Sequence, residues 1–193
     1  MSRRRTWRRT AAAHAGRLAS VALVLLVAAA TPAVGADGIE TRPRRTTAAL
    51  SRYEQDLLQA VNAMRADWGR AGLTVSPGLT EAAELHTRRM IRRGFFDHEA
   101  PGEAPFWQRI EQFYPSTRYH YWAVGENLAY GSPSIDATEA LDEWMSSPRH
   151  RRSLLTREWR EAGVAAVHVE SAPGEYEGDP ATVITLDLGV RRE

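Results

Sequence analysis

The chain has 193 residues, with 25 Lys and Arg against 24 Asp and Glu, and its formal net charge is +1. It contains no cysteine, which excludes a thiol nucleophile, a thiolate zinc site and disulfide exchange. Six of the basic residues lie within residues 1–36, so the remainder carries a net charge of about −5 and nucleic-acid binding loses its electrostatic support.

Residues 1–36 have the pattern of a secretory signal, because six arginines precede an apolar run from Ala19 to Ala30. Small residues then lead to Ala36, so we predict a signal peptide that is cleaved after this residue and an exported protein. An uncleaved membrane anchor is the alternative, but Pro32 interrupts the run and a spanning helix needs roughly 20 apolar residues. Residues 37–50 are polar and are predicted to form a disordered linker.

The folded domain is predicted to span residues 51–193 and to begin with two amphipathic helices. Ser51 and Glu54 match a capping box, and apolar residues then recur at helical spacing until two glycines. A second helix should run from Pro77 to Gly94, where glycine permits the left-handed conformation that ends helices. Its apolar face includes His86, which we interpret as a core histidine hydrogen-bonded beneath a site rather than as a ligand.

The second half of the domain is predicted to alternate short helices with strands. The expected elements are a short helix after Pro105, an extended segment 119–124 entering a turn at Gly125, a helix capped by Asp136 and ended by Pro148, a turn at 150–155, and strands at 162–170 and 181–190. This order predicts an α+β fold in which helices flank a small, mostly antiparallel sheet.

Three short segments each place an ionisable side chain beside a predicted turn or helix end. They are Gly94-Phe95-Phe96-Asp97-His98, Gly125-Glu126-Asn127-Leu128-Ala129 and Ser147-Pro148-Arg149-His150-Arg151. In this order, and after a helix with Leu79, Ala83, His86 and Met90, they resemble the bacterial, cysteine-free branch of the CAP superfamily, which includes cysteine-rich secretory proteins, antigen 5 and pathogenesis-related proteins. The resemblance covers residues 51–190 and implies a three-layered α-β-α sandwich.

The resemblance also implies that His98, Glu126 and His150 line one central cavity. Many family members add a second glutamate, and Ser147 occupies the matching position in this chain. From the residues alone, all three side chains are expected to come from turns, where they can converge without disrupting regular hydrogen bonding.

Other residues of the same segments are expected to support the cavity. Asn127 is interpreted as structural, with an amide that bridges loop backbone atoms, whereas Arg151 and Ser153 are expected to flank the cavity. Among the tryptophans, Trp68, Trp107 and Trp144 lie at helical core spacings, and Trp122 is the one that could line a groove.

Two imidazoles and a carboxylate allow more than one chemistry. His98 and His150, together with Glu126, would form a first shell for zinc or another divalent metal, with an open position for water. Without a metal, the set is a hydrogen-bonded polar cluster in which Glu126 orients a histidine and raises its pKa. A third interpretation is that each of the three side chains serves only to hydrogen-bond backbone groups of its own loop.

The leading hypothesis from the sequence is an extracellular binding module, with a lipid, a sterol or a cell-envelope component as its ligand. The chain has no nucleophile elbow, no zinc-protease helix, no phosphate-binding glycine loop and no dinucleotide fingerprint. The alternative is a metal-dependent hydrolase of peptides or wall polymers that uses Glu126 as a base. A third hypothesis is a purely structural secreted domain.

Overall fold

The computed structural model describes residues 50–193, so the predicted signal peptide and the predicted linker up to residue 49 lie outside the described range. The elements within this range, in chain order, are α1 (Arg52–Asp67), β1 (Thr74–Val75), α2 (Pro77–Arg93), α3 (Phe106–Glu111), β2 (Tyr121–Gly131), α4 (Ala137–Ser146), α5 (Pro148–Leu154), β3 (Glu161–Val169), the 3-10 helix η1 (Gly174–Tyr176) and β4 (Ala181–Arg192). The predicted α+β class is confirmed.

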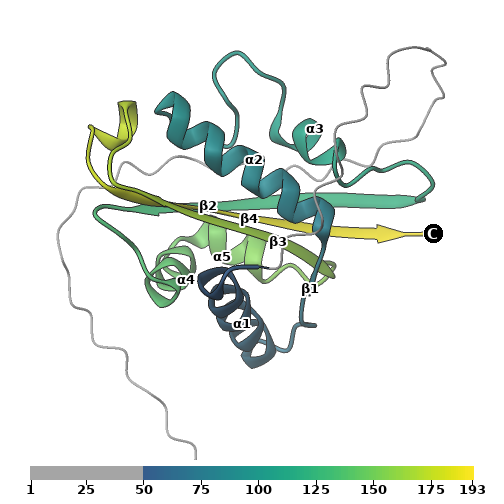
Figure 1. Ribbon diagram of the computed structural model, residues 1–193. Coiled ribbons are helices and arrows are strands. Elements are labelled where there is room, and N and C mark those ends of the chain that lie inside the picture. Colours follow the sequence, from purple (N-terminus) through teal and green to yellow (C-terminus); the bar gives the residue numbers. More distant parts are fainter. Residues whose placement is uncertain (1–49) are drawn as a thin grey trace, which may run out of the picture.

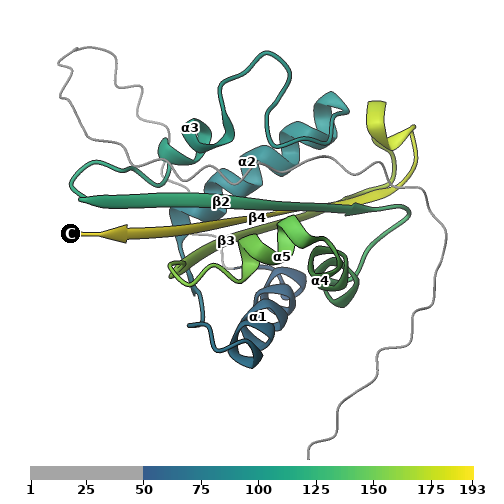
Figure 2. The same ribbon diagram turned by 180° about the vertical axis from the view of Figure 1, so that it is seen from behind.

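The four strands form one sheet in the order β1-β3-β4-β2. The central strand β4 is antiparallel to both β2 and β3, and the two residues of β1 pair with β3 in parallel. Helices α2 and α3 lie on one face of the sheet, and α1, α4 and α5 lie on the other (Figures 1 and 2). The α-β-α sandwich is therefore confirmed, and β2 forms one edge of its sheet.

The predicted helix ends are confirmed in atomic detail. At the start of α1, Ser51 Oγ accepts the backbone N–H of Glu54, and Glu54 Oε2 accepts the N–H of Ser51. Gly94 ends α2 with φ 66° and ψ 39°, a conformation in which glycine carries no steric cost. Asp136 caps α4 through a second capping box with Glu139.

Two of the predicted turns are wrong. Strand β2 continues through Gly125, because this glycine lies beneath a tryptophan and not at a bend: a Cβ on it would be 3.0 Å from Cζ2 of Trp159. Residues 150–155 belong mostly to α5, because Pro148 takes the first position of a new helix, where its missing N–H costs nothing.

Gly163 in β3 lets α2 lie directly on the sheet. A Cβ at this position would be 2.0 Å from the carbonyl carbon of Leu79 and 2.1 Å from the amide nitrogen of Thr80. Both atoms belong to the helix backbone, which cannot rotate away as a side chain can. The close approach of α2 to β3 therefore requires glycine.

We expect Gly163→Ala to lower the free energy of unfolding by about 1–3 kcal/mol, because the added methyl group forces α2 away from the sheet. Urea denaturation measures this change. Gly72→Ala is the matched control, since the nearest atom to its Cβ is Asn62 Oδ1 at 3.7 Å. Equal effects of the two substitutions would contradict the packing argument.

The burial of the tryptophan side chains differs in part from the prediction. Trp144 is fully buried and its Nε1 donates to Leu128 O, as its helical spacing predicts, and Trp107 is partly buried. Trp68 is 52% exposed, so its predicted core position is wrong: α1 ends at Asp67, and the chain has left the helical conformation at Trp68. Trp122 is 8% exposed and donates to Tyr114 O, so it packs in the core and does not line a groove.

Candidate functional site

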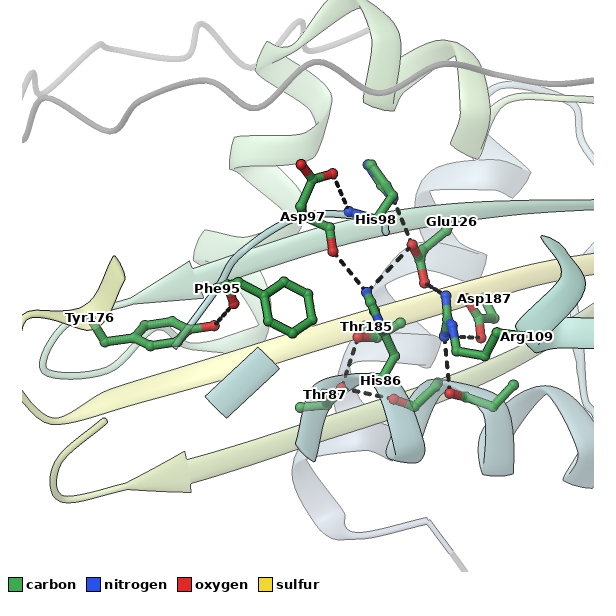
Figure 3. A network of polar contacts seen from close by, with 12 residues as sticks. His86, Thr87, Phe95, Asp97, His98, Arg109, Glu126, Tyr176, Thr185 and Asp187 are labelled. Atoms are coloured by element: carbon green, nitrogen blue, oxygen red, sulfur yellow. Dashed lines mark hydrogen bonds and ion pairs between the residues drawn. The ribbon is translucent and has the colours of Figure 1, made fainter. Parts of the chain in front are cut away.

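Glu126 lies in the middle of β2, on the face of the sheet that α2 and α3 cover. The expectation that it comes from a turn is wrong, because β2 runs unbroken past it. His98 follows α2 in the chain, and Arg109 belongs to α3. Figure 3 shows both side chains pointing at the carboxylate of Glu126.

The carboxylate of Glu126 has both oxygens engaged. Its Oε1 lies 2.6 Å from Nδ1 of His98, and its Oε2 accepts a hydrogen bond of 2.5 Å from Nη2 of Arg109. A second imidazole, that of His86, has its Nε2 4.0 Å from Oε1. Because Glu126 is only 2% exposed, this arrangement is shielded from water.

The charge of Arg109 determines the ionisation of Glu126. Burial alone would raise the pKa of Glu126, but the Arg109 guanidinium, with smaller effects from His86 and His98, holds it well below its usual range. Glu126 is therefore a carboxylate at neutral pH, and Nδ1 of His98 donates its hydrogen to it. A carboxylate with so low a pKa is a weak general base.

His86 lies beneath this pair. Its Nε2 donates to the backbone oxygen of Asp97 at 2.9 Å, and burial lowers its pKa to about 4. It is neutral at pH 7, and it fixes the segment that carries His98. The interpretation of His86 as a core histidine hydrogen-bonded beneath the site is confirmed.

The sequence analysis missed Arg109. This side chain is 8% exposed, and its Nη1 also donates to the backbone oxygen of Ala82 in α2 at 3.1 Å. A signal was present: in the short helix after Pro105, Arg109 follows Phe106 by three residues and precedes Ile110, so it shares their apolar face. A charge on such a face requires a buried partner.

Asp187 was also missed as a site residue. It faces Glu126 directly across the β2–β4 pair, and its Oδ2 lies 3.8 Å from Nη1 of Arg109. It is fully buried, and neither oxygen has a hydrogen-bond partner within residues 50–193. Burial raises the pKa of Asp187, and the charge of Glu126 raises it as well. The charge of Arg109 lowers the pKa by less, so the pKa of Asp187 lies well above its usual value.

Asp187→Asn should change how stability depends on pH. The folded protein holds a proton on Asp187 that the unfolded chain releases above about pH 4, so this group stabilises the fold at low pH and the contribution is lost as pH rises. We expect the asparagine variant to be more stable than the parent by about 1–2 kcal/mol at pH 8.

The comparison requires urea unfolding at pH 4 and pH 8. The advantage of Asp187→Asn over the parent should shrink at pH 4. Asp142→Asn, at an exposed position of α4, is the control and should leave the pH dependence unchanged. Parallel pH profiles for the parent and Asp187→Asn would contradict the assignment of the bound proton.

His150 approaches the same region from the opposite layer. Successive side chains of a strand point to opposite faces, so Asn127 faces α5, and its Nδ2 donates to the backbone oxygen of His150 at 3.3 Å. Burial, with a smaller effect from the charge of His98, lowers the pKa of His150 to about 4. The two imidazoles thus approach the edge strand β2 from opposite sides.

His150 belongs to the first turn of α5, so the expectation that it comes from a turn is wrong as well. Asn127 does bridge to backbone, although its partner belongs to a helix and not to a loop. Ser147 is partly buried at the junction of α4 and α5, where its backbone N–H donates to Glu143 O and its side chain makes no capping hydrogen bond. Arg151 is exposed, with its Nη1 3.5 Å from Met145 O, whereas Ser153 is buried.

The predicted metal shell of His98, Glu126 and His150 is poorly matched by the donors. In the described part of the chain, no three His, Asp or Glu side chains are grouped so that they could hold a metal ion. Both Glu126 oxygens are hydrogen-bonded, and the adjacent guanidinium of Arg109 would repel a second cation. The residues present therefore fit a divalent ion poorly.

Curated relatives of this chain are bacterial. It is 28% identical over 118 residues to the uncharacterized protein YkwD of Bacillus subtilis, a match that covers 61% of this chain and 44% of YkwD. It is 27% identical over 111 residues to the uncharacterized membrane protein YlbC of the same organism, covering 58% of this chain and 30% of YlbC. The chain thus spans less than half the length of these relatives. Within residues 50–193, no helix has the length and apolarity needed to cross a membrane.

Solved structures share the fold. An extracellular protein containing an SCP domain from Bacillus anthracis superposes with a TM-score of 0.55 at 21% identity, covering 73% of this chain and 40% of that one. An outer surface protein from Borrelia burgdorferi gives a TM-score of 0.55 at 18% identity, covering 72% of this chain and 92% of that one. Residues 58–183 match the CAP family, described as the cysteine-rich secretory protein family. The α-β-α sandwich of the structure agrees with this match. The chain therefore belongs to the CAP family.

Proposed function

We propose that this chain is an extracellular binding module that holds a hydroxyl-bearing component of the cell envelope between His98 and His150. The observation that supports this most is the fixed state of Glu126, whose two oxygens are engaged by His98 and Arg109. A carboxylate held in this way orients the imidazole of His98 and does not itself react. The export signal expected from the sequence and the extracellular or surface relatives support a role outside the cell.

The two imidazoles offer polar groups to a ligand. Because Nδ1 of His98 is bound to Glu126, its Nε2 is the nitrogen that remains for a ligand. His150 is neutral at pH 7, since burial lowers its pKa to about 4. Ring nitrogens suit an uncharged hydrogen-bonding ligand, and the hydroxyl groups of an envelope glycan have this chemistry.

A cavity on the described part of the chain is smaller than a lipid or sterol ligand typically needs. Such ligands need a large apolar pocket, typically about 300–1,000 Å³. A cavity of about 200 Å³ lies between α1, α2 and β3, where it is lined by Leu50, Glu54, Thr80 and Val167 among others, and none of the site histidines contributes to it. The large exposed hydrophobic residues of the described range, Trp68 and Val75, lie beyond α1 and in β1.

The metal-dependent hydrolase stays a prediction that this geometry does not favour. Its proposed base, Glu126, has a pKa held well below the usual range by Arg109 and is therefore a poor proton acceptor at neutral pH. The ion pair of Glu126 with Arg109 serves instead to anchor His98.

Co-sedimentation with isolated peptidoglycan tests the proposed function. We expect the purified protein to bind, and the double variant His98→Ala, His150→Ala to bind at least about ten-fold more weakly, because two hydrogen-bonding groups are lost. The double variant His120→Ala, His168→Ala is the control, since both of these histidines are exposed. Circular dichroism establishes that each variant is folded.

A parallel assay uses vesicles of phosphatidylglycerol and phosphatidylethanolamine. Binding to vesicles without binding to peptidoglycan would overturn the proposal in favour of a lipid ligand. Peptidoglycan binding that survives in the folded His98→Ala, His150→Ala variant would overturn the assignment of the site.

A further inference from the structure

Three buried polar atoms without hydrogen-bond partners gather between β2 and α5. They are Oδ1 of Asn127, Nδ1 of His150 and Oγ of Ser153, and none has a partner among residues 50–193. This cluster lies on the face of β2 opposite Glu126 and Arg109, so it is separate from the ion pair described above.

The three side chains are neighbours. Nδ2 of Asn127 donates to the backbone oxygen of His150, and Ser153 follows His150 by three residues, on the same side of α5. Oγ of Ser153 lies 3.6 Å from the position that a Cβ on Gly125 would take. Gly125 precedes Asn127 by two residues and shares its face of the strand. The three unpartnered atoms therefore lie on one side of β2, facing α5, beside the place where Trp159 packs against Gly125.

Buried polar atoms in folded proteins almost always have a partner, and a buried water typically makes about three hydrogen bonds to such atoms. The three atoms here are an amide oxygen that only accepts, a hydroxyl group that donates and accepts, and a ring nitrogen. Their number and chemistry match one water molecule.

We propose that Asn127, His150 and Ser153 hold one buried water, which fixes the proton of the neutral His150 ring on Nε2. The hydroxyl hydrogen of Ser153 has no other acceptor within the described residues, so it is donated to the water. The water then donates one hydrogen to Oδ1 of Asn127 and the other to Nδ1 of His150. Each hydrogen of the network is used once, and Nδ1 of His150 carries none.

This arrangement deepens the proposed function and rests on it, because it specifies what the two imidazoles offer to a ligand. His98 has its hydrogen on Nδ1, bound to Glu126, and presents an accepting Nε2. His150 presents a donating Nε2–H. One acceptor and one donor together are what a single ligand hydroxyl requires, since a hydroxyl both donates and accepts. Asn127 and Ser153 are positioning residues that act through His150.

Nitrogen NMR of the protein labelled with ¹⁵N-histidine tests this at pH 7 without any ligand. We expect His98 to carry its proton on Nδ1 and His150 on Nε2. In Ser153→Ala the water loses its hydroxyl donor and can accept from Nδ1–H, so His150 should become a mixture of the two tautomers. Ser171→Ala, in the exposed loop after β3, is the control and should leave His150 unchanged.

Binding provides the second readout. Ser153→Ala should weaken peptidoglycan binding about five-fold, the effect of one lost or misdirected hydrogen bond, although Ser153 does not touch the ligand. A parent protein with the His150 proton on Nδ1, or a crystal structure with ordered waters but none bonded to these three atoms, would overturn the inference. Either result would leave the proposed function intact if the His98→Ala, His150→Ala variant still loses binding.

Discussion

Arg109→Met is expected to lower the free energy of unfolding by about 3–5 kcal/mol, because it removes one partner of a buried ion pair. The guanidinium lies 2.5 Å from Oε2 of Glu126 and 3.8 Å from Oδ2 of Asp187. Methionine retains the apolar length of the side chain but leaves two carboxyl groups facing each other without a cation. Guanidinium chloride denaturation at pH 7 measures the change.

The matched control is Arg92→Met, in the last turn of α2, where the side chain is exposed. Its expected effect is within about 0.5 kcal/mol, as is usual for surface substitutions. Adding Glu126→Gln to Arg109→Met should recover part of the lost stability, since the remaining buried charge is then removed. An Arg109→Met variant as stable as the control would contradict the role of the guanidinium.

Trp144→Ala is expected to cost about 3–5 kcal/mol, the range for truncating a large buried aromatic side chain. Trp144 is fully buried between α4 and the sheet, and its Nε1–H donates to the backbone oxygen of Leu128 in β2. The substitution therefore opens a cavity and leaves a strand carbonyl without its partner.

Trp68→Ala is the control for this change, because Trp68 is 52% exposed. The same substitution there should alter the free energy of unfolding by about 0.5 kcal/mol or less. Thermal unfolding followed by circular dichroism compares the two variants directly. A loss of stability at Trp68 that equals the loss at Trp144 would show that the exposure of Trp68 is assigned wrongly.

Local chemistry made much of this fold predictable. The capping boxes at Ser51 and Asp136 and the left-handed glycine at Gly94 are decided by a few adjacent residues, so a sequence pattern identifies them. Strand alternation located β3 and β4 within one or two residues of their observed bounds.

The wrong predictions depend on contacts between residues far apart in the chain. A glycine such as Gly125 is typical of a turn. This one lies in a strand, because the ring of Trp159, 34 residues later, packs against it where other residues have a side chain. Trp122 lies beside polar and aromatic residues that suggest a groove, yet its indole is bonded to Tyr114 O within the core. No pattern of neighbouring residues in the sequence indicates these contacts.

The sequence predicted some residues of the site and missed others. His98, Glu126 and His150 were identified through the family resemblance, and the structure brings His98 and Glu126 into contact. Arg109 and Asp187 were missed because the groups they interact with lie on other elements, far away in the chain. The charge balance of the site depends on them, and it can be seen only when α3, β2 and β4 are assembled.

Calorimetric titration of zinc into the purified protein tests the central claim most directly, namely that these imidazoles are arranged for hydrogen bonding with Glu126 fixed by Arg109. We predict no tight binding that depends on the two histidines, so the parent and the His98→Ala, His150→Ala variant should give the same weak heats. Stoichiometric, tight zinc binding by the parent that is lost in the variant would contradict the account, because it would require both imidazoles to present lone pairs to a metal.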